Sequence, residues 1–330
     1  MRLSAPIEVY WWLTSRCNLS CAFCLADGGA PYPGGELDEA GRLAVLRGLT
    51  EARVLRVVLS GGEPMLLPGI YGYISELSRA GVSVELTTNG TLIDREAAAR
   101  LWDSGLRKVQ LSLNGSTAAV NDPLMGESYG RITDALDMLV RLGFIVSVKA
   151  TATRRNMDDV PALARMLMSR GVVKVKVADP TPMGRAFTMR DTLTPGLDEI
   201  RSLRETLQGL AASGTVEFGS FMLSMSESGA AARCTASGAA AYRAIITPDG
   251  AMAPCTMATL WPKKLNVAEL GLTGAWERFA EYSGYLDPDR LGGACGTCLE
   301  KNDCGGGCRP LAYLFTGDLN GGYSLCPMGG

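Results

Sequence analysis

Cysteines are the residues of this chain with the most distinctive chemistry, and the 330 residues include ten Cys and no His. The first three, Cys17, Cys21 and Cys24, form a C-x-x-x-C-x-x-C motif. Thiolates are the usual ligands of iron–sulfur clusters, and three ligands rather than four leave one iron open to a further ligand. A structural zinc knuckle is the alternative, but zinc would need a fourth ligand and no His exists to supply it.

The other seven cysteines lie in the last third of the chain at short intervals. They are Cys234, Cys255, Cys295, Cys298, Cys304, Cys308 and Cys326. A C-x-x-C pair places two thiolates on one tight turn facing one metal centre, and both zinc and iron sites use it. Spacing alone therefore predicts metal binding without choosing the metal. Because His is absent, proton transfer would fall to other groups or to water, and the sequence identifies no catalytic acid or base.

The composition excludes several classes of partner. The net charge is −2 and 47% of the residues are hydrophobic, so no basic excess favours nucleic acid or an anionic membrane surface. No apolar run approaches the ~18 residues of a membrane span, and Met1–Pro6 lacks a signal-peptide pattern. We expect a cytoplasmic protein, whose reducing surroundings favour metal-ligating cysteines over disulfides.

Alternating strand-like and helix-like segments must position the first Cys motif. Runs rich in Val, Leu, Ile and Thr predict strands at Glu8–Thr14, Val54–Ser60, Val82–Thr88, Lys108–Leu113, Ile145–Thr151 and Val172–Ala178. Capping residues and terminal glycines predict helices at Asp38–Ala52, Leu67–Ala80, Asp94–Ser104, Tyr129–Leu142 and Met157–Arg170. Successive β-then-α units indicate a parallel sheet covered by helices, and six strands are too few for an eight-stranded barrel.

We therefore expect an α/β fold that begins with a partial (β/α)6 TIM barrel over residues 1–190. The first Cys motif falls in the loop after the first strand, where barrel enzymes place their chemistry. A helix at Pro195–Ala212 is predicted within a linking segment at 191–230. Residues 231–330 form a small Cys-rich domain, whose core is too thin to hold without metal.

The Cys17–Cys24 motif resembles the hallmark of the radical S-adenosylmethionine (SAM) superfamily. That resemblance implies a [4Fe–4S] cluster on these three cysteines, with its open iron chelated by the amine and carboxylate of SAM. One electron then cleaves SAM to a 5′-deoxyadenosyl radical, which abstracts a hydrogen atom. Gly61-Gly62-Glu63 after the second strand is similar to the family's GGE motif. The resemblance implies that the glycines let the backbone approach the SAM amine and that Glu63 orients it.

Further SAM contacts are implied by position in the family pattern. Phe23 lies where an aromatic residue packs on adenine, and Ser112 and Asn114 lie where polar groups contact the ribose. Arg185 belongs to a P-x-G-R-A stretch that related enzymes share, and Thr88–Gly90 closes the third strand. Ordinary turn chemistry or burial in the core is the alternative for each.

All seven C-terminal cysteines match the extended SPASM pattern of radical SAM maturases, which implies two auxiliary [4Fe–4S] clusters and three clusters in total. The distal cluster would be held by Cys295, Cys298, Cys304 and Cys326, and the cluster nearer the active site by Cys234, Cys255 and Cys308. Ala240 stands where some sulfatase-maturating relatives have a further Cys, so we expect a non-Cys or open fourth position on the proximal cluster. Thr256 replaces their proton-accepting Asp, which argues against sulfatase maturation by the same mechanism.

The expected function is hydrogen abstraction from an unactivated C–H bond, with oxidation or cross-linking of a ribosomal peptide side chain. One alternative is the same chemistry on a small-molecule metabolite such as a tetrapyrrole or antibiotic precursor, since haem-trimming SPASM enzymes share the opening and ending motifs. A non-catalytic iron–sulfur or zinc protein is the alternative of another class. Expected partners are the substrate, a reducing protein such as flavodoxin or ferredoxin, and a separate peptide-recognition protein, because only 16 residues precede Cys17.

Overall fold

Parallel strands form the sheet of the larger part of the computed structural model. They are β2 (Arg56–Ser60), β3 (Ser83–Thr88), β4 (Lys108–Ser112), β5 (Ile145–Thr151), β6 (Lys174–Ala178) and β7 (Val216–Gly219). Neighbours in the chain are neighbours in the sheet, and every pair runs parallel. β1 (Glu8–Trp12) precedes them. The predicted α/β fold with a partial parallel barrel is confirmed, and β7 is a further strand that the sequence analysis did not identify.

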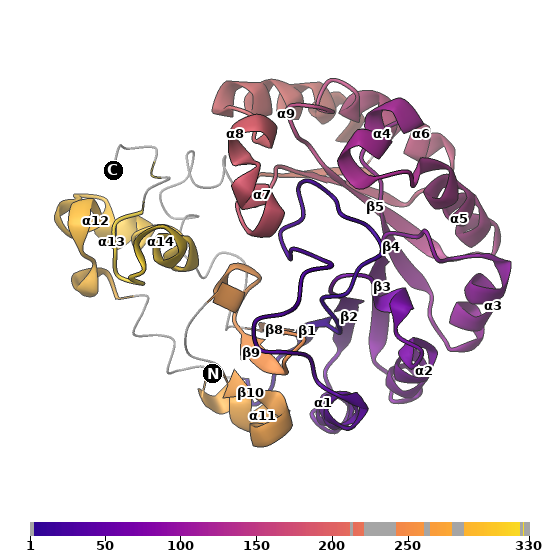
Figure 1. The fold of residues 1–330 in the computed structure, drawn as a ribbon, viewed down its shortest axis with the longest axis horizontal. Coiled ribbons are helices and arrows are strands. Elements are labelled where there is room, and N and C mark those ends of the chain that lie inside the picture. The colour runs from indigo at the N-terminus through magenta and orange to yellow at the C-terminus, as the bar shows by residue number, and fades with distance from the viewer. Residues whose placement is uncertain are drawn as a thin grey trace. The chain divides into compact units, whose positions relative to one another are not determined.

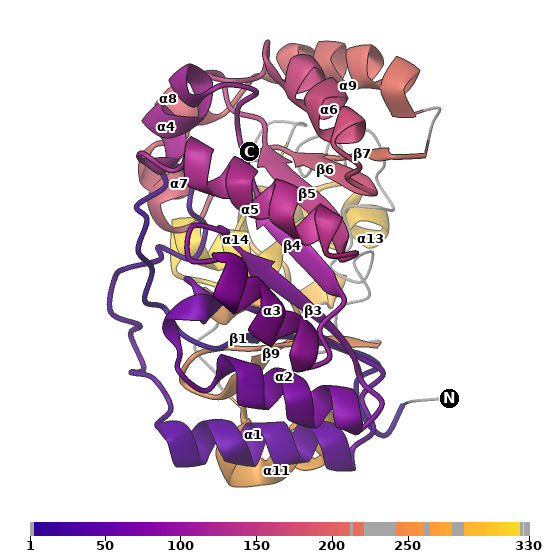
Figure 2. The ribbon, with the colours of Figure 1, turned by 90° about the vertical axis from the view of Figure 1, so that its right-hand side faces the viewer.

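Helices connect these strands and cover one side of the sheet (Figure 1). They are the one-turn 3₁₀ helix η1 (Pro64–Leu66) and the α-helices α2 (Ile70–Arg79), α3 (Arg95–Asp103), α4 (Ala118–Met125), α5 (Tyr129–Arg141), α6 (Val160–Ser169), α7 (Gly184–Thr188), α8 (Arg190–Leu193) and α9 (Leu197–Ala211). In Figure 2, α2, α3, α5 and α6 follow one another over the strands. The helices predicted in this part of the chain are all present, whereas α4, α7 and α8 were not predicted.

Local chemistry explains where these helices begin and end, as α3 illustrates. The Asp94 carboxylate accepts the N–H of Ala97 at 2.8 Å and so caps the first turn. Gly105 follows the helix with a φ of 93°, a left-handed conformation that glycine adopts at little cost.

Alternation along the strands gives the sheet two different faces. In β5, Val146, Val148 and Ala150 are buried, while Ser147 and Lys149 between them remain partly exposed. β4 and β6 alternate in the same way. Apolar side chains therefore pack toward the helices, and polar side chains line the other face.

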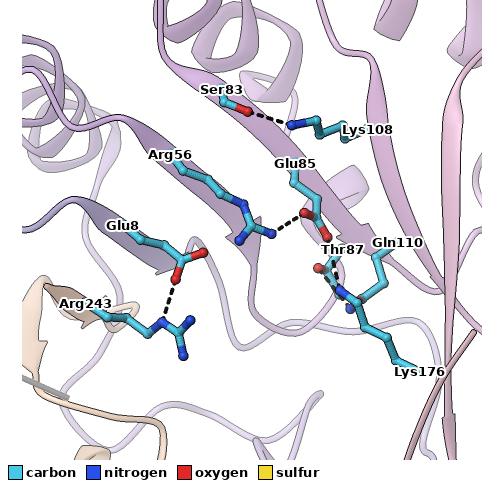
Figure 3. Close-up of polar contacts among 9 residues, drawn as sticks. All are labelled: Glu8, Arg56, Ser83, Glu85, Thr87, Lys108, Gln110, Lys176 and Arg243. Carbon is cyan, nitrogen blue, oxygen red and sulfur yellow. Dashed lines mark hydrogen bonds and ion pairs between the residues drawn. The ribbon is translucent and has the colours of Figure 1, made fainter. Parts of the chain in front are cut away.

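The polar face carries a network of charges across three strands (Figure 3). Glu85 on β3 is buried and pairs with Arg56 on β2 and, at 3.9 Å, with Lys176 on β6. The Lys176 ammonium also donates to Gln110 Oε1 at 2.9 Å. Two cations thus offset the cost of burying one carboxylate, and the balance of charge on this network is positive.

A second, smaller unit is assembled from three separate stretches of the chain. It comprises Met1–Tyr10, Leu37–Leu55 and Met222–Gly330, while the larger unit comprises Trp11–Glu36 and Arg56–Phe221. The smaller unit holds the antiparallel strands β8 (Arg243–Ile246), β9 (Ala251–Ala253) and β10 (Leu265–Asn266). It also holds α1 (Glu39–Glu51), which was predicted, and α11 (Val267–Glu277), and these two helices pack together with Gly48 against Leu272.

The rest of the smaller unit consists of short elements. They are η2 (Met257–Leu260), η4 (Pro288–Arg290), α12 (Gly293–Thr297), α13 (Lys301–Cys304) and α14 (Arg309–Thr316). The structure describes residues 3–211, 214–220, 242–260, 265–278, 287–323 and 326, so Cys234 and Ala240 lie outside the described residues. No helix within these ranges is long and apolar enough to cross a membrane. The domain boundaries at 190 and 230 stay predictions.

Candidate cofactor-binding site

The loop after β1 carries Cys17, Cys21 and Cys24, as predicted, and lies wholly within the larger unit. We call residues 17–28 the Cys loop. Burial raises the pKa of Cys21 to about 12, the neighbouring thiols of Cys24 and Cys17 add to this effect, and the Arg185 guanidinium opposes it. The three sulfurs are therefore close enough to influence one another. Without a cation the Cys21 thiol keeps its proton, and ligation of iron as a thiolate would release it.

Backbone hydrogen bonds fix the shape of the Cys loop. The Ala22 N–H donates to the Leu124 carbonyl in α4 at 3.0 Å. Within the loop, the Gly28 N–H donates to the Cys24 sulfur at 3.2 Å. An N–H directed at a cysteine sulfur stabilises the thiolate form that a cluster requires.

Gly61 and Gly62, which follow β2, lie against the backbone of the segment that follows β1. A Cβ on Gly61 would lie 2.4 Å from the Thr14 carbonyl oxygen, and one on Gly62 would lie 2.2 Å from that of Arg16. The Gly62 N–H also donates to the Thr14 carbonyl at 2.7 Å. Only glycine fits at either position. The pair therefore allows the loop after β2 to pack directly against the loop after β1. The implied approach to the SAM amine stays a prediction.

Glu63 is fully buried beside this contact. Its carboxylate accepts the Met65 N–H at 3.0 Å, the Thr88 hydroxyl at 2.7 Å and the Asn89 N–H at 2.8 Å. Burial raises the pKa of Glu63, and these three hydrogen bonds act in the opposite direction. Its charge also contributes to raising the pKa of Cys17, which places the two groups near each other. A carboxylate held in this way favours a cationic ligand such as an ammonium group.

Asn89 connects the end of β3 to the Cys loop. Its Nδ2 donates to Asn18 Oδ1 at 2.9 Å and lies 4.0 Å from the Cys17 sulfur. Asn18 in turn donates to the Thr91 hydroxyl at 2.8 Å. Thr88–Gly90 was singled out from the sequence, whereas Asn18 was not, although the place of Asn18 directly after the first cysteine is a usable signal.

Arg185 lies on α7, after β6, and holds the Cys loop through hydrogen bonds. Its Nε donates to the Cys21 carbonyl at 2.9 Å, and its Nη1 donates to Asp27 Oδ1 at 2.7 Å and to the Gly28 carbonyl at 2.9 Å. A Cβ on the preceding Gly184 would lie 2.8 Å from loop carbonyl oxygens, so glycine is required there as well. The structure thus assigns Arg185 contacts with the loop itself, and its contact with SAM stays a prediction.

The other predicted SAM contacts are placed differently. Phe23 is half-buried within the loop, and Ser112 ends β4. Asn114 is only 1% exposed, and both polar atoms of its side chain are engaged by the protein. Its Oδ1 accepts the Thr151 N–H at 2.6 Å, and its Nδ2 lies 2.9 Å from the Met125 sulfur. The geometry therefore gives Asn114 a structural role, and its contact with ribose is untested.

Lys149 is a candidate that the sequence analysis missed. It lies on the polar face of β5, opposite Ser112 on β4 and Lys176 on β6. Its ammonium makes no hydrogen bond or ion pair with any residue in the described ranges. Burial, and then Lys176, lower the pKa of Lys149. A cation in this setting favours an anionic ligand, and the usable signal was a lysine alternating with apolar residues in a strand.

Six cysteines of the C-terminal array lie in described parts of the smaller unit, all as free thiols. They are Cys255, Cys295, Cys298, Cys304, Cys308 and Cys326. The Gly306 N–H donates to the Cys304 sulfur at 3.2 Å, and the Tyr323 N–H donates to the Cys295 sulfur at 3.3 Å. Gly305–Gly307 have φ of 64°, 76° and 70°, a left-handed run available to glycine that turns the chain between two cysteines.

Backbone N–H groups are directed at cysteine sulfurs in both groups of cysteines. Such hydrogen bonds stabilise the thiolate form that ligation of iron or zinc requires. Among the described residues, no three Cys, Asp or Glu side chains lie close enough together to hold one metal ion.

Comparison with known proteins agrees with this chemistry. Residues 13–167 match the model of the radical SAM superfamily. The chain is 31% identical to the mycofactocin maturase MftC of Mycobacterium tuberculosis, over 99% of this chain and 84% of that protein. It is 26% identical to the AdoMet-dependent heme synthase of Methanosarcina barkeri, over 96% of this chain and 94% of that protein. It is also 26% identical to the PqqA peptide cyclase of Gluconobacter oxydans, over 98% and 91%.

A solved structure shows the same fold. Streptococcus suis SuiB bound to S-adenosylmethionine superposes with a TM-score of 0.76 and 20% identity. The match covers 99% of this chain and 78% of SuiB. At this identity the likeness establishes the fold alone, a partial barrel followed by a Cys-rich C-terminal part.

Proposed function

The chain belongs to the radical SAM superfamily, and from this membership we propose that it oxidises or cross-links a side chain of a ribosomal precursor peptide. It is an enzyme of the maturase class, with SAM and a [4Fe–4S] cluster as cofactors. When bound, this pair supplies a radical that removes hydrogen from a C–H bond. A peptide substrate is supported by the similarity to the PqqA peptide cyclase and by the greater identity to a maturase than to the heme synthase.

The observation that carries the proposal is the seating of the Cys loop against a buried carboxylate. Cys17, Cys21 and Cys24 would hold the cluster, and Glu63 near Cys17 would accept a hydrogen bond from the SAM amine. Lys149 offers a positive charge on the same sheet for the SAM carboxylate. An anionic and a cationic side chain that both face the amino-acid part of SAM would orient the ligand before any chemistry occurs.

Two auxiliary [4Fe–4S] clusters belong to the proposal as well. Cys295, Cys298, Cys304 and Cys326 hold the distal one, and Cys234, Cys255 and Cys308 the proximal one. Ligands from both sets lie within one short stretch of the smaller unit. When bound, these clusters would accept the electrons released by oxidation of the substrate, and a ferredoxin or flavodoxin would supply the electron that starts each cycle. A separate peptide-recognition protein would present the precursor.

The test is anaerobic reconstitution with iron and sulfide, followed by reduction with dithionite in the presence of SAM. We expect 5′-deoxyadenosine, and we expect a peptide encoded beside the gene to lose two hydrogens in mass spectrometry. Glu63→Gln should abolish SAM turnover, while Glu217→Gln on β7, which alters an exposed ion pair with Lys174 on β6, should not. Iron-loaded protein that leaves SAM intact would refute the enzyme class. SAM cleavage with modification of a tetrapyrrole, and none of peptides, would replace the substrate.

A further inference from the structure

Tyr323 has a buried hydroxyl that the polypeptide does not satisfy. The residue follows α14 in the loop that leads to Cys326 and is 3% exposed. Among the described residues, its hydroxyl has no hydrogen-bond partner. Leaving a buried hydroxyl unsatisfied costs about 1–3 kcal/mol, so such a group indicates a partner that is not part of the polypeptide.

Tyr323 is hydrogen-bonded to the cysteine array through its backbone. After burial, the nearby thiols of Cys308 and Cys326 are the largest influences that raise the pKa of Tyr323, while Arg309 opposes them. The backbone of the same residue is tied to the array, since its N–H donates to the Cys295 sulfur at 3.3 Å. Its carbonyl accepts the Cys326 N–H at 3.1 Å. Tyr323 therefore lies close to three cysteines of the array.

The loop that carries Tyr323 is held in place by buried contacts. Arg309 is fully buried, and its Nη1 donates to the Leu319 carbonyl at 3.3 Å and the Gly321 carbonyl at 2.9 Å. The Asn320 carbonyl accepts the Gly292 N–H at 2.7 Å. These bonds fix the chain just before Tyr323, so its hydroxyl is presented to the cysteines in a set position rather than on a free arm.

We propose that the Tyr323 hydroxyl donates a hydrogen bond to a sulfur of the auxiliary clusters, between Cys308 and Cys326. The inference rests on the proposed function, because the two cysteines are ligands of different clusters there. A hydrogen bond to sulfur stabilises the more negative, reduced state of a cluster and so raises its reduction potential. Tyr323 would then set the potential at the junction of the two clusters, where electrons from the substrate pass.

The experiment is an EPR-monitored redox titration of the fully reconstituted enzyme and its Tyr323→Phe variant. We expect the midpoint potential of one auxiliary cluster to become more negative in the variant, and that of the first cluster to stay unchanged. Tyr313→Phe, on α14 of the same unit, is the matched control and should leave all midpoints in place. An iron content of about twelve per chain, four per cluster, shows that a variant holds all three clusters.

A second measurement uses the unaltered enzyme. Electron–nuclear double resonance on the reduced auxiliary clusters should detect a coupled proton that exchanges in D₂O, and Tyr323→Phe should remove it. Full iron loading with unchanged midpoints and no such proton in the unaltered enzyme would overturn the inference and point to a buried water as the partner. Only about four irons per chain in the unaltered enzyme would instead refute the auxiliary clusters of the proposed function.

Discussion

The two groups of cysteines are held in opposite ways. The Cys loop is contacted from segments that follow β3, β4 and β6, through Asn89, Leu124 and Arg185. In the smaller unit, Cys295 and Cys304 lie on helices of 5 and 4 residues, and Cys308 precedes a helix of 8 residues after the turn Gly305–Gly307. Helices this short have little stability of their own. The fold therefore places the first group of cysteines, whereas around the second group we expect bound metal to stabilise the fold.

The largest effect should come from removing the first group. With Cys17, Cys21 and Cys24 all changed to Ala, SAM cleavage should be lost completely, because no iron remains to bind SAM. Iron should fall from about twelve to about eight per chain. Because the fold does not depend on these ligands, thermal unfolding of the larger unit should barely change. Iron analysis and calorimetry check this, and unfolding of the larger unit would remove the contrast between the regions.

Removing one ligand of the second group should instead disrupt structure. Cys298→Ala or Cys304→Ala should expose the residues beyond about 230 to protease, since metal-binding free energy supports the folding of a thin core. Limited proteolysis followed by mass spectrometry should show a resistant fragment that ends near that point. Cys24→Ala is the control and should keep the digestion pattern of the unaltered enzyme. The same protease resistance in all three variants would contradict the comparison.

An intermediate effect is expected where the fold positions the first group. Arg185→Met removes three hydrogen bonds to the Cys loop, and misplacement of reacting groups on this scale costs roughly 10- to 100-fold in rate. We expect such a decrease in 5′-deoxyadenosine formation. Arg190→Met is the matched control, because that side chain is half-exposed and donates to the nearby Phe187 carbonyl. Equal rates for the two variants would show that the loop holds its shape unaided.

The smallest effect should appear in the binding of SAM. Lys149→Met should weaken SAM binding by about tenfold, the equivalent of one modest charge interaction. Because the pKa of Lys149 is lowered, its positive charge is lost as pH rises, at a lower pH than for an ordinary lysine. SAM affinity should therefore fall on the alkaline side in the unaltered enzyme. Lys149→Arg keeps its charge and should abolish that fall in anaerobic equilibrium dialysis. Identical pH profiles would contradict the assignment.

The sequence was sufficient for features that depend on local pattern. Runs such as Ile145–Thr151 and caps such as Asp94 predicted strands and helices within a few residues of their observed bounds. β7 escaped because four residues, Val216–Gly219, carry too little alternation to stand out. α4 escaped because Pro123 lies inside it, and an internal proline normally argues against a helix.

The candidate site could be predicted only as far as its residues share a motif. The cysteines and Gly61–Glu63 are short patterns, whereas the contacts that position them join residues far apart in the chain. The predicted contact of Arg185 with SAM stays a prediction, and its hydrogen bonds to the Cys loop were not foreseen from the sequence. Lys149 became a candidate only because the strand register places it beside Ser112 on β4 and Lys176 on β6. That register cannot be read from the sequence.

The fastening of the Cys loop by Arg185 has a consequence for the order of events during synthesis. Cys21 and Arg185 are separated by 164 positions, which a ribosome covers in roughly ten to thirty seconds at about 5–20 residues per second. Throughout that interval the Cys loop lacks its hydrogen bonds from Arg185. We therefore expect insertion of the first cluster into its final geometry to follow translation of β6 and Arg185.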